Sequence, residues 1–340
     1  MRRWLVGAIL AFLLLLGGPA IWLQHELNTP YFGAAGLGSF VDISRGAGIG
    51  AIADALKAGG ALRHKLPFLL YVRWTGQARH LRAGEYRFTS PARPARIVQR
   101  LVQGDVYFRT VTIPEGLTAR ETIALLVRVG FSNEKEMEEL INRVDWIADL
   151  DPRAGSLEGY IWPETYRFSR HTTPEEMLKA MVTQFRVRMS SLLAANPLPS
   201  GWSIPQIVTL ASMIEKEAKT ADERRLVASV LRNRLRLKMP LSCDPTIIYA
   251  LKMAGTYAGS LHKANLGMAS AYNTYTHPGL PPGPIANPGA DSLQAALEPA
   301  PSDYLYYVSR NDGTHFFSKD LRTHLQAVAR YQTRRHSGER

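Results

Sequence analysis

The sequence is poor in cysteine, with Cys243 alone among 340 residues. One cysteine excludes an intrachain disulfide framework and any zinc site that needs several thiolates. The nine histidines show no H-E-x-x-H or similar spacing, so the sequence does not indicate a zinc hydrolase. We therefore expect neither a metal nor a cofactor.

Motifs of nucleophilic catalysis and of phosphate binding are also missing. No G-x-S-x-G occurs, and no glycine-rich phosphate motif. The single S-x-x-K, at residues 260–263, lies in a glycine-flanked loop without a following K-T-G, so we treat it as coincidental. A carboxylate remains as the candidate for the principal catalyst.

One apolar run is long enough to suggest a membrane span. Residues 5–23 carry no charge, and a spanning helix needs about 20 residues. Arg2 and Arg3 precede the run, which predicts a cytoplasmic tail at 1–4, an anchor at 5–23 and the rest of the chain beyond the membrane. A cleaved signal peptide is the alternative, although the run exceeds a usual h-region and "GPA" is a poor cleavage site.

Acidic residues are outnumbered, with 29 Asp and Glu against 41 Lys and Arg, for a net charge of +12. The excess is strong between Arg63 and Arg109, where ten basic residues face only Glu85 and Asp105. Such a region attracts anionic lipid or an anionic glycan polymer, or is simply a solvated surface. Nucleic acid is not an expected partner for a part of the chain outside the cytoplasm.

Two segments resemble each other at an offset of 70 residues. Val41–Gly60 and Val111–Gly130 each read as a short strand, a glycine turn, an amphipathic helix and a glycine stop. We expect an α+β protein in which the anchor and a linker at 24–38 precede a small α/β module at 39–108. A mixed α/β catalytic domain with a helical core would follow at 109–335, and a frayed tail at 336–340. Further helices are predicted at 65–74, 94–103, 174–195, 204–219 and 221–239, and strands at 83–89 and 304–309.

The stretch "ASMIEKEAKT" contains two glutamates on opposite flanks of one apolar helix stripe. Glu215 precedes Lys219 by four residues, which is a favourable surface pairing. Glu217 has no such partner and lies near a helix end, because "TADE" at Thr220–Glu223 predicts a capping box that starts the next helix. The C-terminal end of a helix and partial burial both favour the protonated acid, as general-acid catalysis requires. An ordinary surface glutamate is the alternative.

Two further stretches carry candidate residues. Asp244 in "CDPT" is expected to cap a helix, and Cys243 to pack as a small residue. The loop "SAYNTYTHPGLPPGPIANPG" at 270–289 presents tyrosine and amide side chains that suit sugar rings and hydroxyls. A surface connection is the alternative, but a loop this long without regular structure is usually functional or disordered.

These residues together resemble the endolytic murein transglycosylases of the MltG/YceG family. The resemblance covers most of residues 158–309 and rests on "EGYIWPETY", "LASMIEKEA", "CDPTIIYAL" and "AYNTYTHPGLPPGPIANPG". It extends, more loosely, to a LysM-like module containing "AGEYRF". Cys243 departs from the Ser or Thr usual in the family.

The resemblance implies cleavage within peptidoglycan strands at the MurNAc-β-1,4-GlcNAc bond, leaving 1,6-anhydro-MurNAc ends. The family's catalytic glutamate falls on Glu217. It also implies strand termination beside penicillin-binding synthases, from a single-pass position in the inner membrane with the catalytic domain in the periplasm. Our candidates for substrate binding are Tyr272, Asn273, Thr274, Tyr275, Asp244, Glu158, Glu164 and Glu215.

Two rival functions stay open. A muramidase would add a second carboxylate, Asp244 or Glu164, to activate water. A non-catalytic scaffold would bind peptidoglycan and release nothing. The unpaired acid beside a sugar-suited loop argues against the scaffold.

Overall fold

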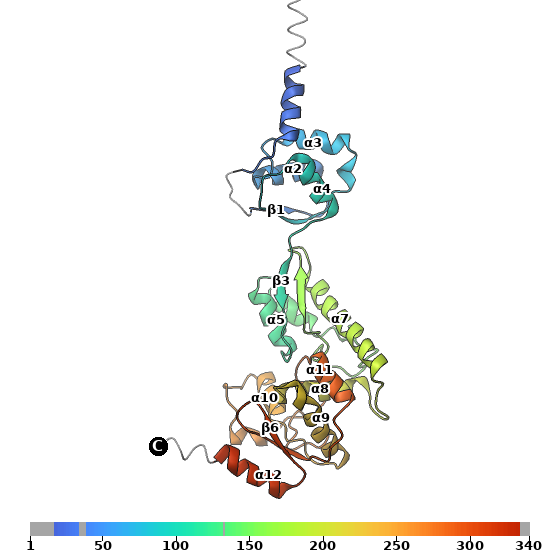
Figure 1. Ribbon diagram of the computed structural model, residues 1–340, viewed down its shortest axis with the longest axis vertical. Helices are drawn as coiled ribbons and strands as arrows, with labels where there is room; N and C mark the ends of the chain where they lie inside the picture. Colours follow the sequence, from blue (N-terminus) through green and yellow to red (C-terminus); the bar gives the residue numbers. More distant parts are fainter. Residues whose placement is uncertain (1–16, 34–38, 132, 334–340) are drawn as a thin grey trace, which may run out of the picture. The chain divides into compact units, whose positions relative to one another are not determined.

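The computed structural model describes residues 17–33, 39–131 and 133–333, which form a mixed α/β protein of two compact units (Figure 1). Unit 1 comprises the described residues up to Thr110 together with Arg167–Thr172. Unit 2 comprises Val111–Tyr166 and the described residues from Thr173 onward. The described strands pair in three two-stranded sheets: β1 with β2, β3 with β4, and β5 with β6.

Unit 1 consists of one antiparallel pair of strands with helices packed on it. Antiparallel strands β1 (Ser39–Ile43) and β2 (Gly84–Phe88) are joined through α2 (Ile49–Ala58), α3 (Lys65–Trp74) and the 3-10 turn η1 (Gln77–Arg79). Helix α4 (Pro94–Gln103) follows β2; a proline at its start and the left-handed Gly104 at its end explain its bounds. Apolar side chains of all these elements except η1 form one core, as the alternating sequence pattern predicts.

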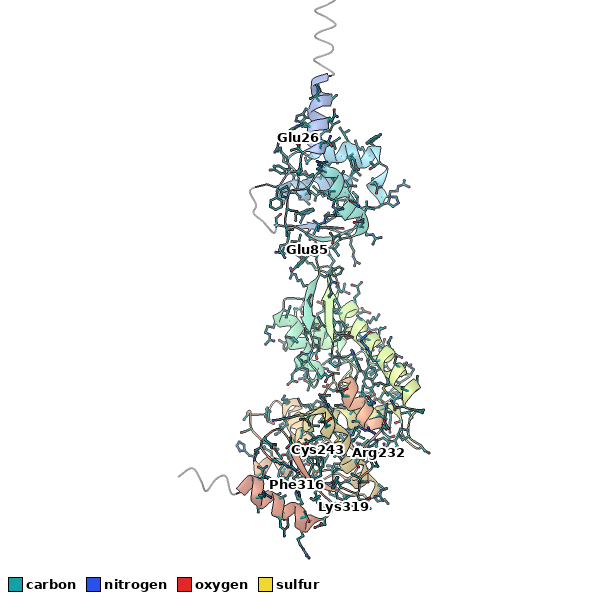
Figure 2. All side chains as sticks on the ribbon, viewed as in Figure 1. Glu26, Glu85, Arg232, Cys243, Phe316 and Lys319 are labelled. Carbon is teal, nitrogen blue, oxygen red and sulfur yellow. The ribbon has the colours of Figure 1, made fainter. Side chains whose placement is uncertain are left out.

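Unit 1 also buries one carboxylate. The Glu85 side chain is 2% exposed, and its oxygens lie 3.5 Å from Arg109 and 3.3 Å from Arg170. Figure 2 labels Glu85 in this unit. The two arginines flank the acid from outside the β1–β2 pair, so Glu85 is held by ion pairs that the sequence spacing could not reveal.

The first part of unit 2 includes part of the paired strands β3 (Arg109–Thr112) and β4 (Thr165–Phe168); Arg109, Thr110, Arg167 and Phe168 belong to unit 1. Helix α5 (Ala119–Arg128) begins with a capping box in which Thr118 and Glu121 satisfy each other's backbone amides. The elements α6 (Glu134–Leu140) and η2 (Val144–Trp146) lead on, and the long helix α7 (Pro174–Ala195) follows β4. Thr173 and Glu176 form a second capping box at the start of α7.

The remainder of unit 2 is mostly helical. Helix α8 packs against α9, α10 and α11, and α12 packs on the β5–β6 pair. Figure 1 shows this cluster in the yellow to red part of the chain. Its elements are α8 (Ile204–Glu217), α9 (Ala221–Arg236), α10 (Asp244–Met253), η3 (Lys263–Gly267), α11 (Ala290–Leu297), β5 (Tyr306–Ser309), β6 (His315–Ser318), α12 (Leu321–Val328) and η4 (Ala329–Thr333).

The predicted membrane anchor requires correction. Its residues 5–16 lie outside the described residues, and its residues 17–23 belong to a helical segment at 17–28 that continues into polar sequence with His25 and Glu26. Across the ranges that the structure describes, no helix has both the length and the apolar character needed to cross a bilayer. The prediction of a single-pass protein of the inner membrane, with its catalytic domain in the periplasm, is therefore wrong by this finding.

Candidate active site

Glu217 is the last residue of α8. Pro205 near the start of the helix and Gln206, which accepts from the Ser203 amide at 2.9 Å, define where α8 begins. Ala218 leaves the helix with extended backbone angles, which places Glu217 at the negative end of the helix dipole. The preceding turns of α8 are buried, so the core fixes the position of the Glu217 backbone.

The Glu217 carboxylate touches the lone cysteine. Cys243 is fully buried, and its thiol donates to Glu217 Oε1 at 3.0 Å. The Cys243 amide donates to Thr274 Oγ1 at 3.0 Å, which ties the start of α10 to the loop at 270–289. Figure 2 labels Cys243 within the helical part of unit 2. Three segments that are distant in sequence therefore meet at Glu217.

The surroundings of Glu217 favour its protonated form. Burial raises the pKa of the Glu217 carboxyl above its usual range, and the negative charge of Asp244 raises it further. Hydrogen bonds from Cys243 and Tyr307 and the nearby His315 ring lower this pKa without reversing the shift. A carboxylic acid that keeps its proton near neutral pH can donate it to a leaving group.

Asp244 lies beside Glu217 and faces outward. It is the first residue of α10 rather than the residue before the helix, and its side chain is exposed. The Tyr275 hydroxyl donates to Asp244 Oδ1 at 2.5 Å. The structure thus brings Asp244 and Tyr275 together with Glu217, three of the candidates from the sequence.

Asn273 and Thr274 hold the loop in place from within. Both are buried; the Asn273 amide donates to the Leu266 and Met268 carbonyls, and its oxygen accepts from the Tyr275 amide. Thr274 bonds to the Cys243 amide and to the Thr246 hydroxyl. These contacts orient Tyr275 and Cys243, while the side chains of Tyr272 and Tyr275 are partly exposed.

Three residues near Glu217 were not among the site residues predicted from the sequence. Tyr307 on β5 and His315 on β6 both approach Glu217, and their rings pack edge to face at 5.4 Å. Glu223 on α9 accepts from both the backbone amide and Nδ1 of His315, each at 2.7 Å. The proposed Thr220–Glu223 capping box does not form, because Glu223 points to His315 instead. The strand-like "YYVS" was the one signal that could have drawn attention to Tyr307.

Glu215 occupies a different environment two residues away. Its Oε2 accepts from the Gly289 amide at 3.1 Å and from the Ser292 hydroxyl at 2.7 Å. Its Oε1 lies 3.7 Å from Arg224, and its side chain is 7% exposed. The predicted surface pairing with Lys219 is wrong, since Glu215 turns inward to fasten α11 and α9 to α8.

Comparison with known proteins identifies the family of this chain. A model of the YceG-like family matches residues 41–330. The chain belongs to the YceG-like family. This confirms the family resemblance seen in the sequence, and the matched range includes most of unit 1.

Named relatives agree with that membership. The endolytic murein transglycosylase of Bacillus subtilis is 32% identical over 86% of this chain and 84% of its own length. That of Streptococcus pneumoniae R6 is 27% identical over 86% of this chain, which spans only 58% of the streptococcal protein. A crystal structure of a yceG-like protein from Listeria monocytogenes covers 85% of this chain and 99% of its own, with 30% identity and a TM-score of 0.57.

Two other candidate carboxylates of this YceG-like protein lie apart from Glu217. Glu164 bonds to Gln184 and Arg188 of α7. Glu158 is buried, accepts from the Ala119 amide at 3.0 Å and from the Tyr249 hydroxyl at 3.3 Å, and its pKa is raised by burial to about 8. Neither shares a contact residue with Glu217 among the described side chains.

Two large cavities open in unit 2 of this family member. One of about 1150 Å³ lies at the start of α8 and includes Trp202 and Arg232. The other, of about 610 Å³, contains Glu158 and Tyr272. Glu217 lines neither of them within the described chain. No group of three His, Cys, Asp or Glu residues there has the arrangement of a metal site.

Proposed function

We propose that this protein cleaves peptidoglycan strands at internal MurNAc-β-1,4-GlcNAc bonds and leaves 1,6-anhydro-MurNAc ends, with Glu217 as the general acid and base. Membership of the YceG-like family and relatives named endolytic murein transglycosylase support the activity as a lyase of peptidoglycan. The raised pKa of Glu217, at a helix end beside a tyrosine-bearing loop, is the observation that carries the residue assignment.

One acid suffices for this reaction because the substrate supplies the nucleophile. Protonated Glu217 gives its proton to the glycosidic oxygen as the bond from that oxygen to the muramyl anomeric carbon breaks. The muramyl 6-hydroxyl oxygen then bonds to the anomeric carbon and loses its proton to the Glu217 carboxylate. The acid is thereby regenerated, and no water is consumed.

The neighbours of Glu217 have supporting roles in this proposal. The Cys243 thiol fixes one carboxylate oxygen. Tyr275, held by Asp244, and Tyr272 offer partly exposed rings and hydroxyls to the sugar. Asn273 and Thr274 act through the loop rather than through the substrate.

We also propose a LysM-like, glycan-binding role for unit 1, with the basic region from Arg63 to Arg109 attracting an anionic polymer. The whole enzyme would then end growing strands beside penicillin-binding synthases. The first part is tested by measuring how much of the full-length variant Arg79→Gln, Arg96→Gln binds to sacculi, compared with the unaltered protein. Equal binding of the two proteins would contradict it. Co-purification with a synthase tests the second.

A muramidase is the second candidate, and the position of Asp244 favours it. An exposed carboxylate close to an acid with a raised pKa is the kind of pair that hydrolysis by water uses. The two reactions differ in the mass of their products. The hydrolase adds one water to the cleaved bond, and the transglycosylase does not.

Mass spectrometry of the products from purified sacculi separates these functions. We expect muropeptides one water lighter than hydrolysis products, and their loss in Glu217→Gln. Glu138→Gln, an exposed acid on α6, is the matched control and should retain activity. Hydrolysed ends would establish the muramidase instead, and full activity of Glu217→Gln would remove that residue from the mechanism.

A further inference from the structure

The cavity of about 610 Å³ in unit 2 has a preformed wall next to the loop at 270–289. Gly159 adopts φ +85°, and a Cβ there would lie 2.5 Å from Pro284. The proline loop therefore packs directly on the segment that carries Glu158. Preformed concave sites with a few convergent polar groups are the usual form of ligand sites.

The floor of this cavity is aromatic and carries a neutral acid. Tyr249 and Tyr272 pack with ring centroids 5.0 Å apart. The Tyr249 hydroxyl bonds to Glu158, and burial raises the pKa of Glu158 to about 8, so this carboxyl keeps its proton at neutral pH. The floor thus adds no negative charge at that pH.

The rim of the cavity is basic. Arg120 and Arg153 are exposed, and the described chain provides no ion pair for either of them. Lys252 is paired with Glu121 at 2.6 Å. The remaining acid, Asp151, accepts from the Tyr160 hydroxyl and the Arg153 amide. Two guanidinium groups are therefore uncommitted at the opening, and guanidinium groups match carboxylates in geometry and charge.

The cavity adjoins the surroundings of Glu217 through two elements. Tyr272 of the cavity precedes Tyr275, which bonds to Asp244, by three residues. Tyr249 of the cavity follows Asp244 on α10 by five residues, which is about 7–8 Å along the helix axis. The loop at 270–289 and α10 therefore each contribute residues both to the cavity and to the surroundings of Glu217.

We propose that this cavity binds the carboxylate-bearing peptide attached to the muramyl unit of the substrate, with Arg120 and Arg153 pairing with its carboxylates. The inference rests on the proposed function, because it takes peptidoglycan as the substrate. GlcNAc carries no charge, and the lactyl carboxyl of MurNAc is blocked as an amide wherever a peptide is attached. On peptide-bearing strands the peptide carboxylates are therefore the anions available to both arginines.

Cleavage of two strand preparations by the full-length protein tests the proposal. One preparation keeps its peptides, and the other has been stripped of them by an amidase. We expect the enzyme to prefer the peptide-bearing strands at least about tenfold in kcat/KM. The double variant Arg120→Gln, Arg153→Gln should raise KM about tenfold on those strands, with kcat unchanged. On stripped strands the variant should match the parent enzyme.

The matched control is Arg128→Gln, since Arg128 is an exposed arginine at the far end of the same helix as Arg120. It should behave as the parent on both strands. Equal cleavage of the two preparations by the parent, or an equal loss on both by the double variant, would overturn the proposal. Strand ends released are counted whether or not they are anhydro, so the product type tests the proposed reaction separately.

Discussion

Glu215 and Glu217 lie two residues apart on α8, but the groups around their carboxyls differ in charge and in hydrogen-bonding capacity. Glu215 accepts two hydrogen bonds from α11 and its preceding residue and lies 3.7 Å from Arg224. Glu217 meets a thiol, a tyrosine and another carboxylate, and its pKa is raised by burial. The first environment suits an anion, whereas the second suits a neutral acid.

The difference arises because α8 ends where three segments converge. On one side, α11 presents its amino end and a hydroxyl, both of which donate hydrogen bonds. On the other side, the start of α10 brings Cys243 and Asp244, which give one weak donor and one negative charge. Identical side chains can therefore serve structure and chemistry on a single helix.

The largest effect should come from neutralising each glutamate separately. Glu217→Gln should lower kcat about 100- to 10,000-fold, as for loss of a general acid, with no loss of folding stability. Glu215→Gln should cost about 2 kcal/mol of unfolding free energy, because Arg224 and two donors lose a charged acceptor. Turnover of peptidoglycan and urea unfolding measure the two quantities.

Equal losses of stability in Glu217→Gln and Glu215→Gln, with activity retained in both, would contradict the different roles assigned to the two glutamates. Glu138→Gln, on the exposed face of α6, is the reference for an acid without either role. It should change neither turnover nor the urea midpoint.

The next largest effect concerns Glu158, the other buried acid of unit 2. Its folded-state pKa is about 8, above the value near 4.5 of an unfolded chain. Between these pH values the folded protein holds a proton that the unfolded chain releases. The stability that this group contributes is complete below about pH 4.5 and is lost as pH rises to 8, by about 1.4 kcal/mol per unit.

Urea unfolding at pH 5.5 and pH 7.5 measures this dependence. Glu158→Gln should flatten it, because the amide does not titrate. An identical pH dependence in the parent protein and Glu158→Gln would contradict the assignment of a proton to Glu158.

Local sequence signals predicted much of the fold. The bounds of α4 and α7 follow from a proline at the start and a glycine or polar stop at the end, and the structure reproduces both. The end of α8 was placed within two residues, at Lys219 rather than Glu217. Each of these features depends on residues within one or two helical turns of the boundary.

Contacts across the chain were not predictable in this way. The i, i+4 spacing predicted Lys219 as the partner of the Glu215 carboxylate, but Arg224 and Ser292 are its partners in the structure. The capping pattern predicted that Glu223 would pair with Thr220. In the structure Glu223 instead bonds to His315, which lies 92 residues away in sequence. A buried charged group needs a partner, and the tertiary fold decides which residue lies close enough to be that partner. Local spacing in the sequence does not contain this information.

Asp244 tests which reaction the Glu217 site performs. Its negative charge contributes to the raised pKa of Glu217, so Asp244→Asn should lower that pKa and move the basic limb of kcat/KM to lower pH, by about one unit or less. A pH–rate profile measures the shift, with Asp303→Asn, an exposed acid paired with Lys319, as control. Complete loss of turnover at every pH would instead identify Asp244 as the second carboxylate of a hydrolase.

The smallest effect should come from Cys243, and its direction should be opposite. The thiol hydrogen bond stabilises the Glu217 carboxylate and so lowers its pKa, which means that Cys243→Ala should raise the pKa and move the basic limb upward by about half a unit or less. Cys243→Ser keeps a donor at the same position and should stay near the parent profile. If alanine and serine gave the same profile as cysteine, the contact would be packing alone; shifts of opposite sign at Cys243 and Asp244 would show that both tune one acid.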